Sequence, residues 1–209
     1  ECGPRLFTSS SLVYKTNGGQ WHGRQDVWGG GADWGFRAGY GHRTGSDYST
    51  GSSAFDADGT IPSSYHSRET NFSLGKNLTR DSRLEFSYLR LDQTDVEFPG
   101  LIFDINALQT DAFEVTYSSW DQPAYDLLTI DAWYNRTAFT GDTRRVGKNR
   151  QIPSIRPSFD LDDDQFLATN VDAMSAGYRA AVTWGQDECP QLTVGTDLNR
   201  IGQQLNDIV

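Results

Sequence analysis

The sequence predicts an all-β protein: a partial, antiparallel, up-and-down transmembrane β-barrel, of which this chain supplies about nine strands. Three observations carry the prediction. Apolar and polar residues alternate along segments of about ten residues, the connections between segments alternate between long and short, and aromatic residues lie near the segment ends. A period of two places alternate side chains on opposite faces of a strand. Long strands with one apolar face are typical of a membrane barrel wall.

The clearest segment runs from Trp34 to Arg43. Its even positions are Trp34, Phe36, Ala38, Tyr40 and His42, and its odd positions are glycine or arginine. One face of the expected strand is therefore mostly apolar, and the other is glycine with two cations. An aromatic residue near each end of the apolar face fits a strand that crosses a layer about as thick as a membrane.

The other strands follow from the same alternation. Two weaker strands are expected before Trp34, over about 8–15 and 21–28, separated by the turn sequence Thr16-Asn-Gly-Gly19. After Arg43, clear alternation marks further strands over about 65–77, 84–88, 113–118, 128–135, 174–184 and 191–199. Examples are Leu84, Phe86 and Tyr88 on one face, with charged or hydroxyl residues between them.

The connections alternate in length from the third strand onward. Long, polar connections without periodicity are expected over about 44–64, 92–110 and 137–172, and short turns at 29–33, 78–81, 120–123 and 185–190. In an antiparallel meander alternate connections lie at the same end of the sheet. All long loops therefore lie at one end, which is the asymmetry of outer-membrane barrels.

The two faces of the expected sheet differ in chemistry. On the apolar face, Trp34 and Trp184 lie beside short turns, whereas Tyr40, Tyr88 and Tyr134 lie toward the long loops, like the aromatic belts at two membrane interfaces. The opposite face carries charges and suits a water-filled or plugged interior. Its predicted lumen-facing residues are Arg37, Arg43, Glu85, Glu114, Asp131 and Arg179.

Composition argues against a nucleic-acid-binding protein and against a helical membrane protein. The chain has 209 residues and a formal net charge of −10, which argues against a nucleic-acid partner. No apolar run reaches the roughly 18 residues of a helical membrane span. Cys2 and Cys189 form no C-x-x-C motif, and whether they pair stays open. The chain begins at Glu1 without a leader pattern, so we expect a mature product or a fragment.

Several stretches resemble the early barrel of TonB-dependent outer-membrane receptors. These are Val27 to Tyr48, Ile61 to Tyr65, Ser82 to Tyr88 and Asp131 to Asn135. The resemblance implies a transporter in the outer membrane of a Gram-negative bacterium. Such a receptor binds a scarce solute (an iron-siderophore, cobalamin or a metal complex) and contacts the TonB complex through an N-terminal plug. Its partners would be the lipid bilayer and a small-molecule or metal-chelate ligand.

The chain departs from that family in size. Receptors of this kind have 22 strands and a plugged lumen, whereas we expect about nine strands, no plug and no terminal aromatic. Residues 1–209 are thus interpreted as a single, incomplete domain from the N-terminal portion of a barrel. An open sheet leaves two unpaired edges, which lipid does not tolerate. We expect that this piece does not transport by itself.

No enzyme motif is present: the sequence lacks a G-x-S-x-G elbow, an H-E-x-x-H helix and a phosphate-binding G-x-x-x-x-G-K loop. We predict no catalytic, cofactor or metal residues. Two groups contain metal-ligand residue types, yet plain polar surface is the favoured interpretation of both: His42 with His66 and Asp47, and the acidic stretches Asp56-Ala-Asp-Gly59 and 160–164. The predicted ligand contacts, assigned to loops, are Tyr48, Tyr65, Phe98, Phe103 and Trp133.

The alternative fold is a soluble β-sandwich, whose strands also alternate between apolar and polar faces. It would be a binding module with acidic, calcium-binding loops. Strand length and the regular alternation of connection lengths favour the barrel.

Overall fold

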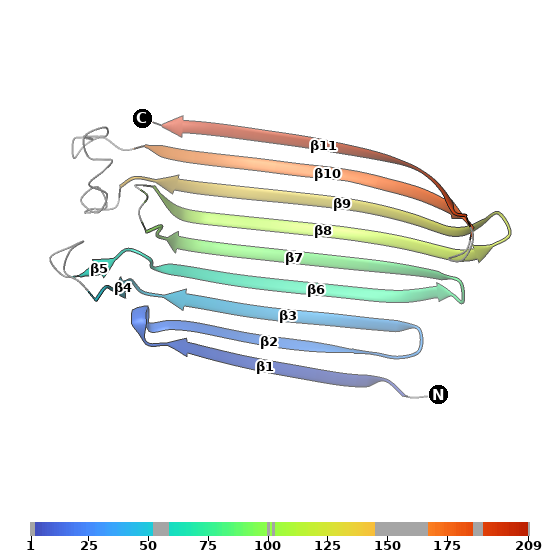
Figure 1. The fold of residues 1–209 in the computed structure, drawn as a ribbon, viewed down its shortest axis with the longest axis horizontal. Coiled ribbons are helices and arrows are strands. Elements are labelled where there is room, and N and C mark those ends of the chain that lie inside the picture. The colour runs from blue at the N-terminus through green and yellow to red at the C-terminus, as the bar shows by residue number, and fades with distance from the viewer. Residues whose placement is uncertain are drawn as a thin grey trace.

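Nine long strands form one antiparallel sheet, in which neighbours in the chain are neighbours in the sheet (Figure 1). This computed structural model describes residues 3–51, 59–99, 101, 103–144, 167–185 and 190–208. The strands are β1 (Arg5–Lys15), β2 (Gln20–Gly30), β3 (Trp34–Gly45), β6 (Tyr65–Thr79), β7 (Ser82–Val96), β8 (Asp104–Gln122), β9 (Tyr125–Asp142), β10 (Ala168–Trp184) and β11 (Leu192–Ile208). The predicted up-and-down arrangement is confirmed, including the two weakly patterned strands before Trp34.

The strands extend further into the long connections than their alternation predicts. β8 begins at Asp104 and β9 ends at Asp142, both inside segments predicted as loop. Polar residues occupy both faces there, so the alternation fades while the backbone hydrogen bonds continue. The first long connection also contains a small ribbon, β4 (Tyr48–Ser49) with β5 (Thr60–Ile61). The sequence predicts no regular element in this connection. The ribbon escapes the prediction because two-residue strands are too short to show a period.

The sheet has no hydrophobic core among the described residues. The largest side chain that is fully buried there is that of Asp104, whereas Val115, Tyr178 and Leu198 are 40%, 43% and 61% exposed. Apart from the β4–β5 ribbon, no second sheet is formed by the described parts of the chain, so the sandwich lacks its second layer. The described residues also include no helix that is long and apolar enough to cross a membrane.

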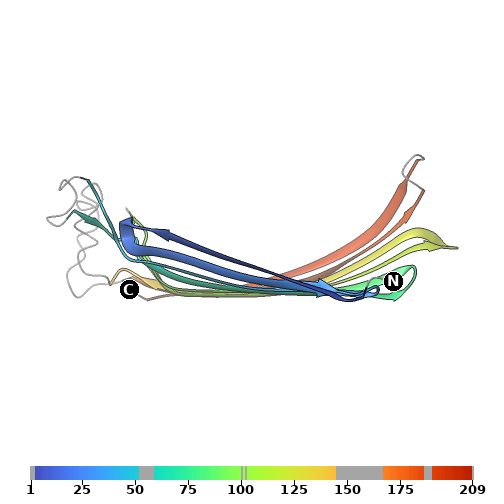
Figure 2. The same cartoon turned by 90° about the horizontal axis from the view of Figure 1, so that it is seen from below.

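The sheet is curved and twisted (Figure 2). A twist of this kind is the normal result of strand geometry, and it bends a long sheet toward a barrel. The polar face lies on the concave side.

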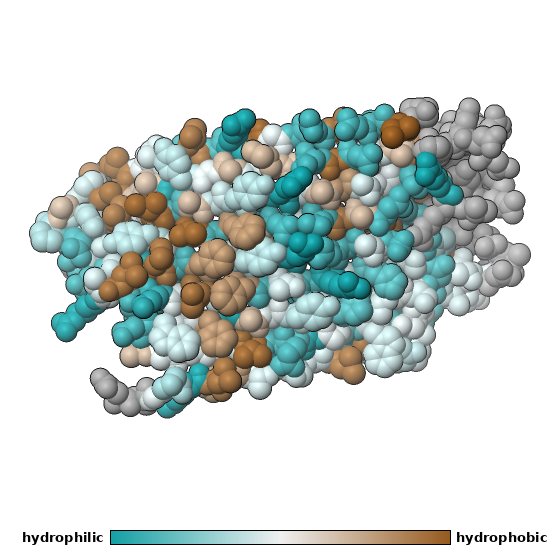
Figure 3. All heavy atoms as spheres, turned by 180° about the vertical axis from the view of Figure 1, so that it is seen from behind, coloured by the Kyte–Doolittle hydropathy of each residue, from teal (hydrophilic) through white to brown (hydrophobic). Residues whose placement is uncertain are grey.

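The apolar side chains form a band that crosses the convex face obliquely (Figure 3). Its edge toward the long connections is marked by tyrosines. The strand register gives the position of each tyrosine along the strands. Tyr40 lies four residues nearer the short turns than Tyr14, and Tyr88 lies two residues nearer them than Tyr40. Tyr134 is level with Tyr88, and Tyr178 lies two residues nearer the short turns than Tyr134. The total is eight residues over the seven steps from β1 to β10.

Between β3 and β10 the opposite edge of the band runs parallel to this line. Trp184 on β10 lies four residues nearer the short turns than Trp34 on β3, over five steps from strand to neighbouring strand. Tyr178 is displaced from Tyr40 by the same four residues over the same five steps. With about 3.3 Å per residue and about 4.8 Å between strands, eight residues over seven steps correspond to a strand tilt of about 40°. Strands in closed barrels tilt by about 35–45°. Over β1 to β10 the tyrosine edge is therefore level at the tilt of a barrel wall, whereas four residues over five steps, the slope of both edges between β3 and β10, correspond to a tilt of about 30°.

Candidate functional site

The polar, concave face holds all six residues that the sequence predicted to face a lumen. Arg37 and Glu114 lie in one cross-strand row, and Glu85, Asp131 and Arg179 lie in the next. Arg43 lies on the same face, nearer the long connections. Their placement follows from the register, whereas their contact with a plug stays a prediction.

A cluster of ion pairs is built on this face from β2, β3 and β6. Arg24 is its centre: its guanidinium donates to both oxygens of Asp26, at 2.7 and 3.0 Å, to Asn71 Oδ1 at 2.8 Å, and to Glu69. Arg37 also pairs with Asp26, at 3.2 Å. Asp26 is only 8% exposed. Charge-assisted hydrogen bonds of this geometry fix side chains in place, so the cluster presents a rigid polar surface.

Two glycines make room for the cluster. Gly39 and Gly41 lie on the polar face of β3, between the β2 and β6 side chains. A Cβ atom at Gly41 would lie 2.7 Å from a Glu69 carboxylate oxygen. The sequence prediction missed Arg24 and Asp26 because β2 alternates poorly. The glycines at alternate positions of β3 were the available signal, since they show where side chains from neighbouring strands lie over the backbone.

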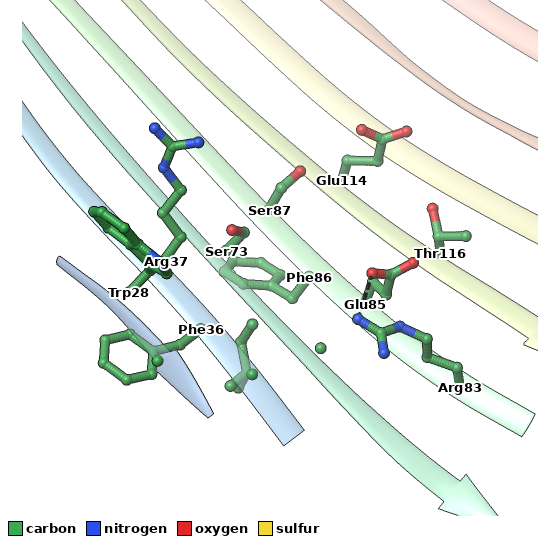
Figure 4. A pocket seen from close by; sticks show the side chains of 14 residues that line it. Trp28, Phe36, Arg37, Ser73, Arg83, Glu85, Phe86, Ser87, Glu114 and Thr116 are labelled. Carbon is green, nitrogen blue, oxygen red and sulfur yellow. Dashed lines mark ion pairs between the residues drawn. The ribbon is translucent and has the colours of Figure 1, made fainter. Parts of the chain in front are cut away.

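Beside the cluster lies a hollow of about 610 Å³ (Figure 4). Its floor is formed where small residues meet: Gly35 pairs with Gly75, and Ser73 pairs with Ser87. Its walls carry opposite charges and one indole, contributed by Trp28, Arg37, Arg83, Glu85 and Glu114. Within it Arg83 pairs with Glu85 at 3.0 Å. A hollow with an aromatic wall and both charges fits a polar partner better than an apolar ligand.

A second hollow of about 590 Å³ continues the first and shares Arg37, Ser73, Ser87 and Glu114 with it. Trp133 lines this second hollow. The sequence prediction placed Trp133 among the loop residues, which is wrong: it lies within β9 on the polar face, level with Gly177. A Cβ atom at Gly177 would lie 2.5 Å from the Trp133 ring, so the missing side chain leaves space for the indole.

The other four predicted ligand contacts lie at the end of the sheet with the long connections. Tyr48 is in the β4–β5 ribbon and Tyr65 begins β6. Phe98 donates its backbone N–H to Asp104 Oδ1, and the Phe103 ring lies 5.9 Å from that of Phe139. Their contact with a ligand stays a prediction.

The metal hypotheses gain no support from the described residues, none of which form a group of three or more metal-binding side chains. His66 Nδ1 is hydrogen-bonded to Thr44 Oγ1 at 3.0 Å, and Asp47 accepts from the backbone of Ser63 and Ser64. His42 lies opposite Arg68 on β6. Cys2, Cys189, Asp56, Asp58 and the acidic stretch 160–164 lie outside the described residues.

The fold defines this chain as a curved, up-and-down antiparallel sheet, part of the wall of a β-barrel. Among solved structures, the chain is similar to one titled "Copper transporter OprC", with a TM-score of 0.78 and 19% sequence identity. The match covers 98% of this chain and 30% of that structure's chain, so this chain spans under a third of its length. No family model matches the sequence, and no curated protein does.

Proposed function

We propose that this chain is a segment of the barrel of a TonB-dependent outer-membrane receptor, which imports a scarce solute such as an iron-siderophore, cobalamin or a metal complex. The fold similarity to a copper transporter supports the transporter class. The convex face contacts lipid, and the concave face lines the lumen. The proposed role is not catalytic, because binding and passage of the solute need no covalent step.

The tilted apolar band is the observation that carries the proposal. A Trp–Tyr separation of six residues, as from Trp34 to Tyr40, covers about 20 Å of strand and about 17 Å along the membrane normal at a strand tilt of about 30°, so both aromatic lines fit inside the apolar zone. The apolar zone of outer-membrane barrels is about 25 Å tall. Between β3 and β10 both edges of the band become level at the same strand tilt, about 30°. A soluble sheet that buries one face has no reason to arrange its aromatic residues in two parallel oblique lines.

The edges of the sheet support a larger barrel. β1 pairs with β2 alone and β11 with β10 alone, within the described residues. Because nine strands alternate in direction, β1 and β11 run the same way (Figure 1). Pairing these two edges would give a parallel contact. A closed antiparallel barrel therefore needs an odd number of further strands, and 13 would complete the 22 strands of plugged transporters.

The ion-pair cluster around Arg24 and the two neighbouring hollows would meet a plug in the intact receptor. The surface offers both signs of charge, with Arg37 and Glu114 at opposite sides of the first hollow. Contacts of this kind give orientation and specificity more than raw affinity. In this family the TonB complex reaches the receptor through the plug, so this chain would contact TonB only indirectly.

Two measurements test the proposal. The full-length protein should fractionate with outer membranes and remain monodisperse in detergent, and removal of detergent should precipitate it. Cells that lack its gene should accumulate less of one limiting solute among copper, iron-siderophore and cobalamin, and a plasmid copy should restore uptake only where TonB is functional. A protein that is monodisperse without detergent, or uptake that is independent of TonB, would contradict the proposal.

A further inference from the structure

The convex face carries two adjoining hollows between the tyrosine edge of the apolar band and the long connections. The first, of about 450 Å³, lies over β9, β10 and β11 and is bordered by Tyr134 and Met174. The second, of about 230 Å³, lies further toward the long connections and also reaches β8. Because the two hollows share Asp172 and Gln204, they form one depression, which we name the outer trough.

Small residues form the floor of the outer trough, and longer side chains form its walls. Two successive cross-strand rows supply most of it: Gln109, Ala138, Asp172 and Gln204, and then Ala107, Thr140, Asn170 and Asn206. In each row an alanine lies beside longer polar side chains. A third row, nearer the short turns, places Gly202 beside Met174. The strands are fully paired here, so the depression results from side-chain size and not from a gap between strands.

The chemistry of the outer trough changes along its length. At the end toward the short turns, its lining includes the Tyr134 ring and the Met174 side chain. In the middle, the Arg136 guanidinium donates to both carboxylate oxygens of Asp172, at 3.0 and 2.6 Å. Toward the long connections the walls are uncharged amides and a hydroxyl, from Thr140, Asn170, Gln204 and Asn206. The trough therefore passes from an apolar end, through one ion pair, to a neutral polar end.

The neutral polar end is open to a ligand. Its four wall side chains are exposed, and none of them hydrogen-bonds within the described parts of the chain. Amides and hydroxyls both donate and accept, as sugar hydroxyls do. The single cation among the described lining residues, Arg136, is paired with Asp172. A hydroxyl-rich group therefore fits this end better than a simple anion.

The height of the outer trough also restricts its ligand. From Tyr134, at the edge of the apolar band, to Thr140 is six residues of one strand, about 20 Å, or about 17 Å along the membrane normal at a tilt of about 30°. The headgroup layer on each side of a bilayer is only about 5–8 Å thick. The polar end thus extends beyond a phospholipid headgroup, to the level that a lipid with a saccharide headgroup would reach.

From this geometry we propose that the outer trough binds a glycolipid of the outer leaflet. Its acyl chain lies over Tyr134 and Met174, and its sugar hydroxyls hydrogen-bond with the amides of Asn170 and Gln204. The inference rests on the proposed function in one respect, since the convex face must contact lipid with the long connections outside. It adds a specific lipid site to that face, separate from the site of the imported solute on the concave face.

Native mass spectrometry of the full-length protein in detergent tests the site with three probes. Lipid A is an acylated disaccharide, dioleoylphosphatidylglycerol is an anionic lipid without a sugar, and chitobiose is a disaccharide without acyl chains. We expect lipid A to bind about tenfold more tightly than phosphatidylglycerol, the effect of one or two net hydrogen bonds. Chitobiose should not be retained. Equal binding of the two lipids would overturn the proposal, because the protein would then recognise only negative charge.

Variants assign the binding to the outer trough. Ala138→Leu fills the floor, and the double change Asn170→Ala with Gln204→Ala removes two amides from the walls. Each should weaken lipid A binding about tenfold and leave phosphatidylglycerol binding unchanged. Gln25→Ala is the control, because Gln25 is an exposed amide on the same face of β2, opposite Tyr40 and outside the trough. It should bind lipid A like the wild type.

Two results would contradict the site. One is wild-type binding of lipid A by both trough variants, and the other is an equal loss in Gln25→Ala. If either occurs while the protein still requires detergent, the glycolipid site is wrong and the proposed barrel stands. A protein that is monodisperse without detergent would contradict both proposals. Phosphatidylglycerol binding serves as the folding check, since a misfolded variant would lose both lipids together.

Discussion

Replacing Val115 by arginine should destabilise the folded protein in a lipid bilayer by about 2–4 kcal/mol, the cost of a basic side chain near the middle of a barrel's lipid face. Val115 lies on β8 within the apolar band, level with Phe86 and Ala132, and is 40% exposed on the convex face. The guanidinium would have to lose its hydration or reach for an interface. Urea-dependent folding of the full-length protein into vesicles measures the loss.

The matched control is Glu114→Arg, one residue away on the same strand. Its side chain lines the hollow on the concave face. If that face is wet, the change should alter the unfolding free energy by no more than about 0.5 kcal/mol, as for most surface substitutions. Equal losses for Val115→Arg and Glu114→Arg would mean that the two faces do not differ in their surroundings.

Gly39→Val should produce the second large effect, a loss of about 1–3 kcal/mol from overpacking. The new side chain would meet Asn71 Oδ1 at 2.5 Å, Asp26 Oδ1 at 2.7 Å and an Arg24 nitrogen at 2.8 Å. Arg24 donates to both Asp26 and Asn71, so none of the three side chains can withdraw without breaking an ion pair or a hydrogen bond. Urea unfolding in vesicles again gives the free energy.

Gly35→Val is the control for this prediction. Gly35 lies on the same strand and the same face, but the nearest atom to its added Cβ is the carbonyl oxygen of Gly29 at 3.5 Å, and the 610 Å³ hollow lies beside it. We expect a smaller loss than at Gly39. The opposite order would show that the ion-pair cluster adapts easily and is not the rigid surface that we infer.

The architecture was predictable because a barrel wall repeats one rule along every strand. Phe86 and Val115 each lie between polar neighbours in the sequence, and Phe36 lies between a glycine and an arginine, so the period of two shows both the strand and its face. The Trp and Tyr positions near strand ends were equally visible. Their oblique alignment was not, because the tilt of the band depends on the register between strands, which a single strand's pattern does not contain.

The candidate site was less predictable, since it depends on contacts between strands. Arg24 and Asp26 lie in a strand with poor alternation, and Glu69 is 45 residues from Arg24. The pattern placed Trp133 on the polar face, yet the loop assignment overrode it. The Ser64 hydroxyl donates to the Glu97 carboxylate across 33 residues of the sequence. No spacing rule in the sequence marks Ser64 and Glu97 as partners.

The most direct test of the account is to determine whether each side chain along one strand is exposed to lipid or to water. Single spin labels at residues 128–135 of β9, introduced into the full-length protein with Cys2 and Cys189 replaced by serine and reconstituted in vesicles, would report access to oxygen and to a water-soluble nickel chelate. We predict an alternation: oxygen access is high at 128, 130, 132 and 134, and nickel access is high at 129, 131, 133 and 135. Uniform access, or the reverse alternation, would contradict a wall with lipid on its convex face and water on its concave face.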